Sequence, residues 1–314
     1  MVDPSVEIAG LRLTSPLLLA SGTVGYGPEY DGLVDFGKVG AIVTKTVTPE
    51  PRAGNAPPRL AETRGGMLNS IGLENVGLER FLSDKLSEAA KLPTRVIASV
   101  AGKSATEFAN LCGAIGERDE TAGLELNISC PNVERARLPL WADPAGVAEV
   151  VSAARHATAK PLFLKLSPNA ADVLSVAEAG EKAGADALVV GNTLPGMRID
   201  VETRAPMLGN RFGGLSGPAL KPVNLALVWR LSAGVGIPIV GSGGIERTED
   251  ALEYLLAGAT AFQVGTAIFR TPSVVGRIID GLAQRAATDG INSLTGYTGL
   301  AKEVETPCQR TRAD

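Results

Sequence analysis

The sequence predicts a single α/β domain, a (β/α)8 barrel with long insertions after its second and sixth strands. Eight short apolar segments recur along the 314 residues, and most are followed by a segment with helical character. The apolar segments are continuous runs, which is typical of parallel strands that are covered on both faces. No Rossmann-type glycine fingerprint follows the first of them, which disfavours the alternative, a doubly wound open sheet.

The predicted elements follow one another in a regular order. Residues 6–13 alternate apolar and polar residues, which predicts a small hairpin over the bottom of the barrel. Strands are expected at residues 16–22, 41–47, 95–100, at the start of 124–132, and at 161–167, 187–193, 238–244 and 261–266. Helices are expected at residues 78–91, 104–117, 144–159, 170–183, 218–233, 248–257 and 272–287. The helix at 144–159 has Asp143 as its expected N-cap and Pro144 at its first position.

Two long segments interrupt this pattern, residues 48–75 after the second strand and residues 194–217 after the sixth. The first is rich in Pro, Gly, Arg and Asn, and loops of this length in compact domains are usually functional. We interpret residues 1–314 as one domain, with the barrel at about residues 16–287 and a polar C-terminal tail at 288–314.

The composition disfavours several classes of function. A hydrophobic content of 45% predicts a sizeable core, and a net charge of −4 does not predict a surface for nucleic acid. Cys112, Cys130 and Cys308 lack metal-ligand spacing, and the single histidine, His156, lies in an Ala-rich helical stretch. Disulfides, a zinc site and a histidine triad are therefore not expected. The N-terminus has no signal-peptide or membrane-spanning run, so we expect a cytoplasmic protein without a membrane partner.

Active sites of (β/α)8 barrels lie at the carboxyl ends of the strands. Ser242-Gly243-Gly244 after the seventh strand and Gly265-Thr266 after the eighth have the position of the usual phosphate site, where backbone N–H groups hold a dianion. Turn glycines that serve geometry alone are the alternative. Other strand ends carry polar side chains with the capacity for chemistry: Ser21, Lys45, Thr46, Ser99, Asn127, Cys130, Lys165, Asn192 and Thr193.

Lys165 lies within an apolar strand, and a buried ammonium is costly unless it meets an anion or several acceptors. A structural ion pair, a Schiff-base lysine and a cation that stabilises negative charge on a cofactor ring all remain open. Lys45 has the same position on the second strand. Four asparagines suit a planar molecule such as a pyrimidine, although an asparagine near a turn is more often a turn residue: Asn69, Asn127, Asn132 and Asn192.

Cys130 follows a strand end and precedes Pro131, which favours a loop over the buried position of most isolated cysteines. A thiol has a reference pKa of about 8.5, so a modest decrease allows it to act as a base near neutral pH. We therefore predict that Cys130 is a catalytic base. We expect Cys112 to be a residue of a helix core and Cys308 to belong to the tail.

These motifs resemble the class 1 dihydroorotate dehydrogenases, and within them class 1B. The resemblance covers about residues 5–287. It is carried by Ala20-Ser21-Gly22, Thr44-Lys45-Thr46, Pro51-Arg52-Ala53-Gly54-Asn55, Met67 to Leu73, Asn127 to Asn132, Lys165 to Asn169, Asn192-Thr193, and Phe212 to Pro218. The last run, with Leu220-Lys221-Pro222, is similar to class 1B rather than to the fumarate-using class 1A. Cysteine as the base, and no apolar N-terminal extension, argue against class 2.

The resemblance implies that the chain oxidises (S)-dihydroorotate to orotate in UMP biosynthesis, with one FMN per chain. Cys130 would take a proton from substrate C5 while a hydride leaves C6 for flavin N5, and Lys165 would stabilise the reduced flavin. FMN contacts are implied for Ser21, Lys45, Thr46, Ser99, Asn127, Lys165, Gly191, Gly217, Gly243, Gly244, Gly265 and Thr266. Substrate contacts are implied for Lys45, Asn69, Ser70, Ile71, Gly72, Leu73, Asn127, Asn132, Asn192 and Thr193.

The resemblance also implies a homodimer within a heterotetramer, whose other subunit carries FAD and a 2Fe-2S cluster and passes electrons to NAD⁺. This chain has no cysteine cluster and no dinucleotide fingerprint, so those cofactors would belong to the partner. Three departures from the family pattern stand out. Ser99 replaces a usual Asn, Gly191 replaces a bulkier residue, and residues 134–141 replace a Gly-rich loop.

Three alternatives remain open from the sequence. One is another FMN-dependent pyrimidine reductase, such as a dihydropyrimidine dehydrogenase subunit. The loop from Asn69 to Leu73 favours orotate over that substrate, because it offers backbone N–H groups to a carboxylate. The second is a phosphate-binding lyase or isomerase that uses Lys165 as a Schiff base. The third is a catalytically silent barrel that serves as a binding subunit.

Overall fold

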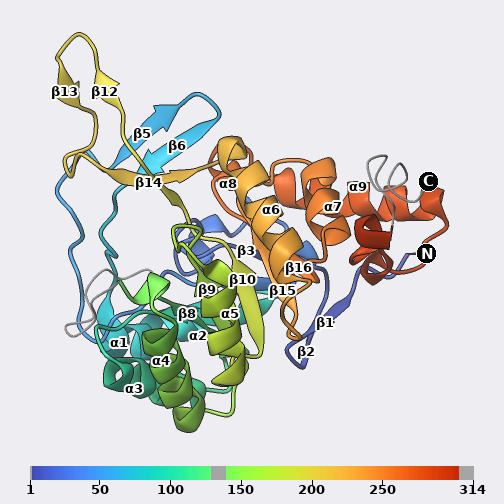
Figure 1. Ribbon diagram of the computed structural model, residues 1–314, viewed down its shortest axis with the longest axis horizontal. Coiled ribbons are helices and arrows are strands. Elements are labelled where there is room, and N and C mark those ends of the chain that lie inside the picture. The colour runs from blue at the N-terminus through green and yellow to red at the C-terminus, as the bar shows by residue number, and fades with distance from the viewer. Residues whose placement is uncertain (1, 129–138, 304–314) are drawn as a thin grey trace, which may run out of the picture.

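Eight parallel strands close into a barrel in the computed structural model, which describes residues 2–128 and 139–303. Each strand pairs with the next in chain order, and the last returns to the first, so the predicted fold class is confirmed (Figure 1). All the predicted strands are present, and most are shorter than predicted. They are β3 (Leu17–Leu19), β4 (Ala41–Val43), β7 (Arg95–Val100), β8 (Gly123–Asn127), β9 (Leu162–Leu166), β10 (Ala187–Val190), β15 (Ile239–Ser242) and β16 (Ala261–Val264).

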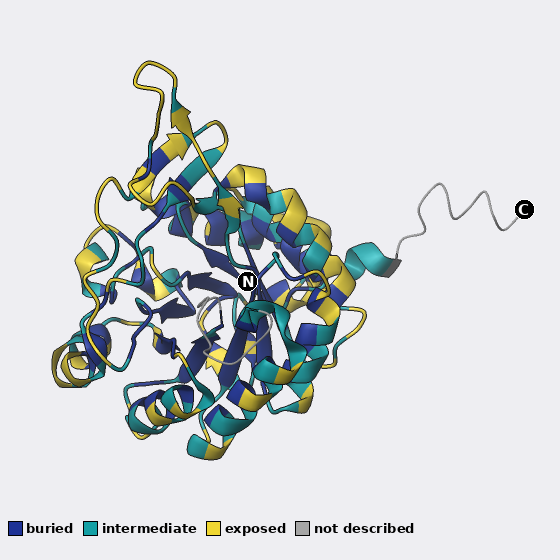
Figure 2. Cartoon of the chain, turned by 60° about the vertical axis from the view of Figure 1, so that its left-hand side comes forward, coloured by how far each residue is buried: buried dark blue, intermediate teal, exposed yellow. Residues whose placement is uncertain are grey.

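Helices surround the barrel close to their predicted positions. α4 begins as predicted, because the side chain of Asp143 accepts a hydrogen bond from the Ala145 N–H and Pro144 follows it. Figure 2 shows the buried strands at the centre, enclosed by helices with exposed outer faces. The long helices are α3 (Ala105–Gly116), α4 (Pro144–Ala157), α5 (Val173–Lys182), α6 (Lys221–Leu231), α7 (Thr248–Leu256) and α9 (Val274–Asp289).

Short helical segments complete the outer layer. The helix expected at residues 78–91 is divided into α1 (Gly77–Arg80), the π-helical η3 (Phe81–Lys85) and α2 (Leu86–Ala89). The short helix α8 (Ala267–Arg270) follows β16 and was not predicted. The 3₁₀ segments within the described residues are η1 (Pro28–Tyr30), η2 (Phe36–Lys38), η4 (Leu140–Ala142), η5 (Pro218–Leu220), η6 (Leu294–Tyr297) and η7 (Leu300–Glu303).

The interior of the barrel is divided into an apolar and a polar layer. The hairpin of β1 (Val6–Ile8) and β2 (Leu11–Leu13) packs Ile8 and Leu13 against Phe163 and other inward side chains of the barrel, as predicted. Two residues further along four strands, on the same inward face, the side chains are polar. This polar layer consists of Ser99, Glu125, Lys165 and Gln263, all at most 7% exposed.

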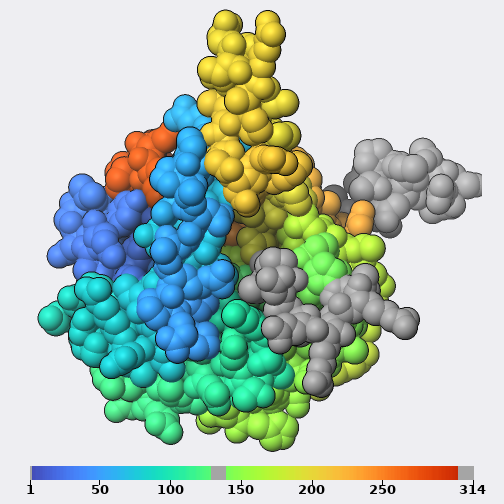
Figure 3. All heavy atoms as spheres, turned by 90° about the vertical axis from the view of Figure 1, so that its left-hand side faces the viewer, coloured from blue at the N-terminus to red at the C-terminus, as the bar shows by residue number. Residues whose placement is uncertain are grey.

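The two long insertions are not merely loops, because they pair with each other. The hairpin of β5 (Leu60–Thr63) and β6 (Gly66–Asn69) joins β14 (Gly213–Ser216) and β11 (Leu194–Gly196) in one antiparallel sheet. The short strands β12 (Ile199–Asp200) and β13 (Ala205–Pro206) form a hairpin that projects from the molecule (Figures 1 and 3). The sheet therefore brings together two motifs that lie far apart in the sequence.

Part of the expected C-terminal tail is packed against the helices of the barrel. Leu294 and Tyr297 of η6 are buried, and the segment contacts α7 and α9. The N–H of Asp3 donates to the carbonyl of Asn292 at 2.8 Å, so this segment also contacts the N-terminal residues. Residues 294–297 therefore cover part of the surface of the domain with their apolar side chains. Cys308 lies outside the described residues.

Candidate active site

A cavity of about 630 Å³ lies at the carboxyl ends of the barrel strands. Its size is in the range of sites for small molecules and cofactors. Of the predicted site residues that the structure describes, all but Ser99 line this cavity. Cys130 and Asn132 lie outside the described residues. The predicted residues that line it are Ser21, Lys45, Thr46, Asn69, Ser70, Ile71, Gly72, Leu73, Asn127, Lys165, Gly191, Asn192, Thr193, Gly217, Gly243, Gly244, Gly265 and Thr266.

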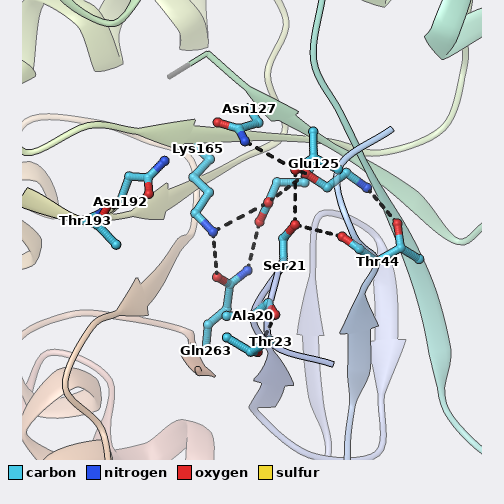
Figure 4. A network of polar contacts seen from close by, with 12 residues as sticks. Ala20, Ser21, Thr23, Thr44, Glu125, Asn127, Lys165, Asn192, Thr193 and Gln263 are labelled. Atoms are coloured by element: carbon cyan, nitrogen blue, oxygen red, sulfur yellow. Dashed lines mark hydrogen bonds and ion pairs between the residues drawn. The ribbon is translucent and has the colours of Figure 1, made fainter. Parts of the chain in front are cut away.

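Lys165 reaches this cavity from the polar layer of the barrel (Figure 4). Its Nζ lies 3.4 Å from Oε1 of Gln263 and 3.6 Å from Oε1 of Glu125. Gln263 Nε2 in turn donates to Oε2 of Glu125 at 2.9 Å. The structural ion pair that we held open is therefore present, and Lys165 also lines the cavity. Glu125 and Gln263 were not among the predicted site residues, although a charged and an amide residue within apolar strands were the available signal.

Ser99 lies behind Thr46 and is fully buried. Its hydroxyl is 3.0 Å from Thr46 Oγ1 and donates to Glu125 Oε1 at 3.2 Å. Thr46 also accepts from Asn127 Nδ2 at 3.3 Å and lies 3.2 Å from the hydroxyl of Ser21. Ser99 faces the interior of the barrel and belongs to its polar layer. It therefore supports the cavity wall through its contact with Thr46.

Lys45 lines the same cavity in a different electrostatic setting. Burial lowers the pKa of Lys45, the Glu74 carboxylate opposes this decrease, and the Arg59 guanidinium adds to it. Glu74 is itself paired with Arg59, which limits its influence on Lys45. Lys45 is therefore a cavity cation whose charge is less firmly held than that of an exposed lysine.

The segment from Ser70 to Leu73 is braced by Asn55. Asn55 Nδ2 donates to the carbonyl and the hydroxyl of Ser70, both at 3.1 Å, and the Asn55 N–H donates to the Ile71 carbonyl at 2.9 Å. Gly72 has a φ of +78°, and a Cβ there would lie 2.6 Å from Oδ1 of Asn55. The two sequence motifs therefore act as one unit, in which Asn55 fixes the loop that faces the cavity.

The turn after β15 forms a cradle of bare backbone. Gly244 has a φ of +74°, and a Cβ there would lie 2.8 Å from the carbonyl oxygen of Gly217. Asn224 Nδ2 donates to the Ser242 carbonyl at 2.7 Å, and Tyr254 Oη donates to the Gly243 carbonyl at 2.8 Å. The glycines thus serve turn geometry, as the alternative held, and they also keep side chains out of this end of the cavity. Such a cradle fits a phosphate group.

Possible metal ligands and one thiol can be placed in the part of the chain that the structure describes. No group of three or more His, Cys, Asp or Glu residues is arranged there to hold a metal ion. Cys112 is buried in α3, as predicted, and burial raises its pKa to about 12, so it is an inert apolar residue. No helix among residues 2–128 and 139–303 is long and apolar enough to span a bilayer.

Comparison with known proteins agrees with this site. The profile of the dihydroorotate dehydrogenase family matches residues 4–286. The chain belongs to this family. Relatives named dihydroorotate dehydrogenase B (NAD(+)), catalytic subunit, place it in class 1B. The relative from Geotalea daltonii is 48% identical over 300 residues, 96% of this chain and 98% of its own. That from Pelobacter propionicus is 49% identical over 297 residues (95% and 98%), and that from Listeria monocytogenes is 46% identical over 290 residues (92% and 95%).

One departure from the dihydroorotate dehydrogenase pattern now has a structural setting. Gly191 is buried beside Asn224, and a Cβ at Gly191 would lie 3.5 Å from Oδ1 of Asn224. That Oδ1 has no hydrogen-bond partner among the described residues. Asn224 therefore packs against the space that Gly191 leaves open. Residues 134–138 of the unusual loop lie outside the described residues.

Proposed function

We propose that this chain oxidises (S)-dihydroorotate to orotate with one bound FMN, as a catalytic step of pyrimidine biosynthesis. One observation carries the proposal. A single cavity combines a backbone cradle suited to a phosphate with asparagine side chains and a braced backbone loop suited to a pyrimidine carboxylate. Membership of the dihydroorotate dehydrogenase family and the names of the class 1B relatives support the same activity.

The residues present fit FMN. Gly217, Gly243, Gly244 and Gly265 line the cavity without side chains, which suits the phosphate end, and Lys165 supplies a positive charge. When bound, FMN supplies the acceptor for the hydride that leaves the substrate. Lys165 is positioned in the protein before the reaction, so its charge favours the negative charge that develops in the transition state without reorganisation.

The remaining roles belong to side chains that hold the substrate and move its proton. We assign the substrate carboxylate to the backbone of Ser70 to Leu73 and to Lys45, and the ring to Asn69, Asn127, Asn192 and Thr193, with Asn132. Thr46 fixes the amide of Asn127 through its hydroxyl. Cys130 is the proposed base that takes the proton from substrate C5, because a thiol is close enough in acidity to act near neutral pH.

Anaerobic mixing of the FMN-loaded chain with dihydroorotate tests this proposal. We expect dihydroorotate to bleach the flavin absorption band and dihydrouracil, which lacks the carboxylate, to leave it unchanged. Bleaching by dihydrouracil alone would move the assignment to a dihydropyrimidine dehydrogenase activity. A chain that binds no FMN but forms a borohydride-trapped adduct on Lys165 would support the lyase alternative.

We further propose that electrons leave through a separate subunit that carries FAD and a 2Fe-2S cluster, within a cytoplasmic heterotetramer built on a homodimer of this chain. The printed names of the relatives, which include NAD(+) and the words catalytic subunit, support this. We expect the isolated chain with dihydroorotate to reduce an artificial acceptor but not NAD⁺. Reduction of NAD⁺ by the isolated chain, followed at the absorbance of NADH, would contradict the need for a partner.

A further inference from the structure

The polar layer of the barrel contains a buried carboxylate directly below the proposed flavin site. Glu125 is fully buried and faces inward from β8, and Lys165 faces inward from β9 (Figure 4). A charge taken out of water is costly unless it is paired and hydrogen-bonded. The described part of the chain holds both members of this pair inside the barrel.

The two members of the pair are held unequally. Glu125 accepts from neutral donors at ordinary distances, 2.9 Å from Gln263 and 3.2 Å from Ser99. The Lys165 Nζ lies at 3.4 Å and 3.6 Å from its acceptors, which is long for hydrogen bonds. The carboxylate is therefore anchored without the lysine, whereas the ammonium is loosely held and the residue that carries it lines the cavity. This arrangement suits a fixed counter-charge and a cation that is available to a ligand.

The anchor of Glu125 is also connected to the cavity wall. Ser99 contacts both Glu125 and Thr46, and Thr46 contacts Asn127 and Ser21, which line the cavity. A change in the Glu125 carboxylate would therefore affect Lys165 directly, and it would affect the cavity wall through the Ser99 hydroxyl. The next layer of described side chains down the barrel is apolar and includes Ile97, Phe163 and Ala261.

We propose that Glu125 is a positioning residue that holds the ammonium of Lys165 in place beneath the bound flavin. The inference rests on the proposed function, because it assumes that a flavin occupies the cavity. Without a carboxylate, a buried amine is more stable in its neutral form. Loss of Glu125 would therefore leave the Lys165 ammonium without its carboxylate and weaken the positive charge at the position that favours the reduced flavin.

The test is the reduction potential of bound FMN in Glu125→Gln, measured with a chemical reductant so that dihydroorotate is not needed. Gln preserves the shape of the side chain and removes its charge. We expect the oxidised-to-reduced equilibrium to shift at least tenfold toward oxidised FMN, a decrease of about 30 mV for a two-electron couple. A direct effect of the lost negative charge would raise the potential instead. An unchanged or raised potential would therefore overturn the inference.

Further variants separate positioning from a general effect on the fold. In a Lys165→Met background, we expect Glu125→Gln to cause no further change in the reduction potential of FMN, because Glu125 acts through Lys165. The potential of Glu125→Asp, which retains the charge, should lie closer to that of the parent. If Glu125→Gln does not fold, Ser99→Ala removes one anchor of the carboxylate and should lower the potential by a smaller amount. Equal shifts with and without Lys165 would contradict the role.

A matched control removes a carboxylate elsewhere. Glu120 pairs with Arg118 before β8, at the opposite end of the barrel, and Glu120→Gln should leave the potential unchanged. A parent chain that takes up no FMN would overturn the proposed function and this inference together. A parent that binds FMN, with no decrease in Glu125→Gln, would overturn this inference alone.

Discussion

Two lysines line one cavity, and they differ in the charged groups that lie beside them. Lys165 has the anchored carboxylate of Glu125 beside it. Lys45 relies on Glu74, which is already paired with Arg59, and burial lowers its pKa. We therefore expect the charge of Lys45 to be lost at a lower pH than the charge of an exposed lysine.

We predict that the affinity for orotate depends on this charge. Because the pKa of Lys45 in the folded chain lies below the ordinary value of about 10.4, its ammonium is present at low pH and is lost as pH rises through the lowered value. Orotate affinity should therefore fall with rising pH before an exposed lysine would titrate. Orotate titrations at the flavin band, from about pH 6 to pH 10, measure this. Lys45→Met should bind weakly throughout, and parallel curves for parent and variant would exclude the role.

The proposed base gives a second prediction at this scale. Cys130→Ala should retain FMN and lose about 10²- to 10⁴-fold in the rate of flavin reduction by dihydroorotate, the usual contribution of a general base. Cys130→Ser should retain a trace of activity with a higher pH optimum, because a hydroxyl is a far weaker acid than a thiol. Stopped-flow traces of the flavin band give these rates. Cys112→Ser serves as a control for loss of a thiol, and full activity in Cys130→Ala would remove Cys130 from the mechanism.

At the scale of elements, the two insertions form one sheet that covers the carboxyl ends of the barrel strands. β6 leads into the loop that Asn55 braces, and β14 leads to Gly217 beside the cradle. Asn69 Nδ2 donates to the Gly214 carbonyl at 3.2 Å across the two insertions. The proposed substrate loop and the proposed phosphate end are therefore connected through the hydrogen bonds of one sheet.

The cradle after β15 gives the prediction for this scale. Gly244→Ala introduces a Cβ 2.8 Å from the Gly217 carbonyl, at a φ of +74°. We expect FMN affinity to fall at least tenfold and riboflavin affinity to fall less, because riboflavin has no phosphate. Equilibrium titrations followed by flavin fluorescence make the comparison. Gly276→Ala, where the new Cβ would be 3.8 Å from the Lys38 Nζ at the end of a flexible side chain, is the control. Equal losses for both flavins would place the phosphate elsewhere.

The barrel was predictable from sequence because its strands are continuous apolar runs with chemically distinct ends. The pairing of β6 with β14 was not, since it joins residues more than a hundred positions apart through short, Gly-rich strands that have no periodic pattern. Glu125 and Gln263 were missed because a polar residue in an apolar run gives no information about its partner across the barrel. Ser99 was assigned to the flavin by resemblance, although its strand position turns it into the polar layer.

At the scale of the whole molecule, the bottom of the barrel serves stability. Ile8 is 1% exposed in the hairpin that packs on the apolar layer, far along the strands from the cavity. We predict that Ile8→Ala lowers the free energy of unfolding by about 2–5 kcal/mol, the usual cost of such a truncation. Urea denaturation measures the loss. FMN affinity at low denaturant should be unchanged, and a decrease in it would show that the two ends of the barrel are coupled.

The polar layer therefore bears on the evolution of this chain, because it separates positions that differ in the effect of a substitution. We expect substitutions below Ser99, Glu125, Lys165 and Gln263 to act mainly on stability, and substitutions among the residues that line the cavity to act mainly on activity. Sites that share no contact usually have additive effects. Stability gained in the lower half is then available to offset costly changes in the upper half. A search for variants with a new pyrimidine preference should start from a parent that has first been stabilised at β1, β2 and the apolar layer.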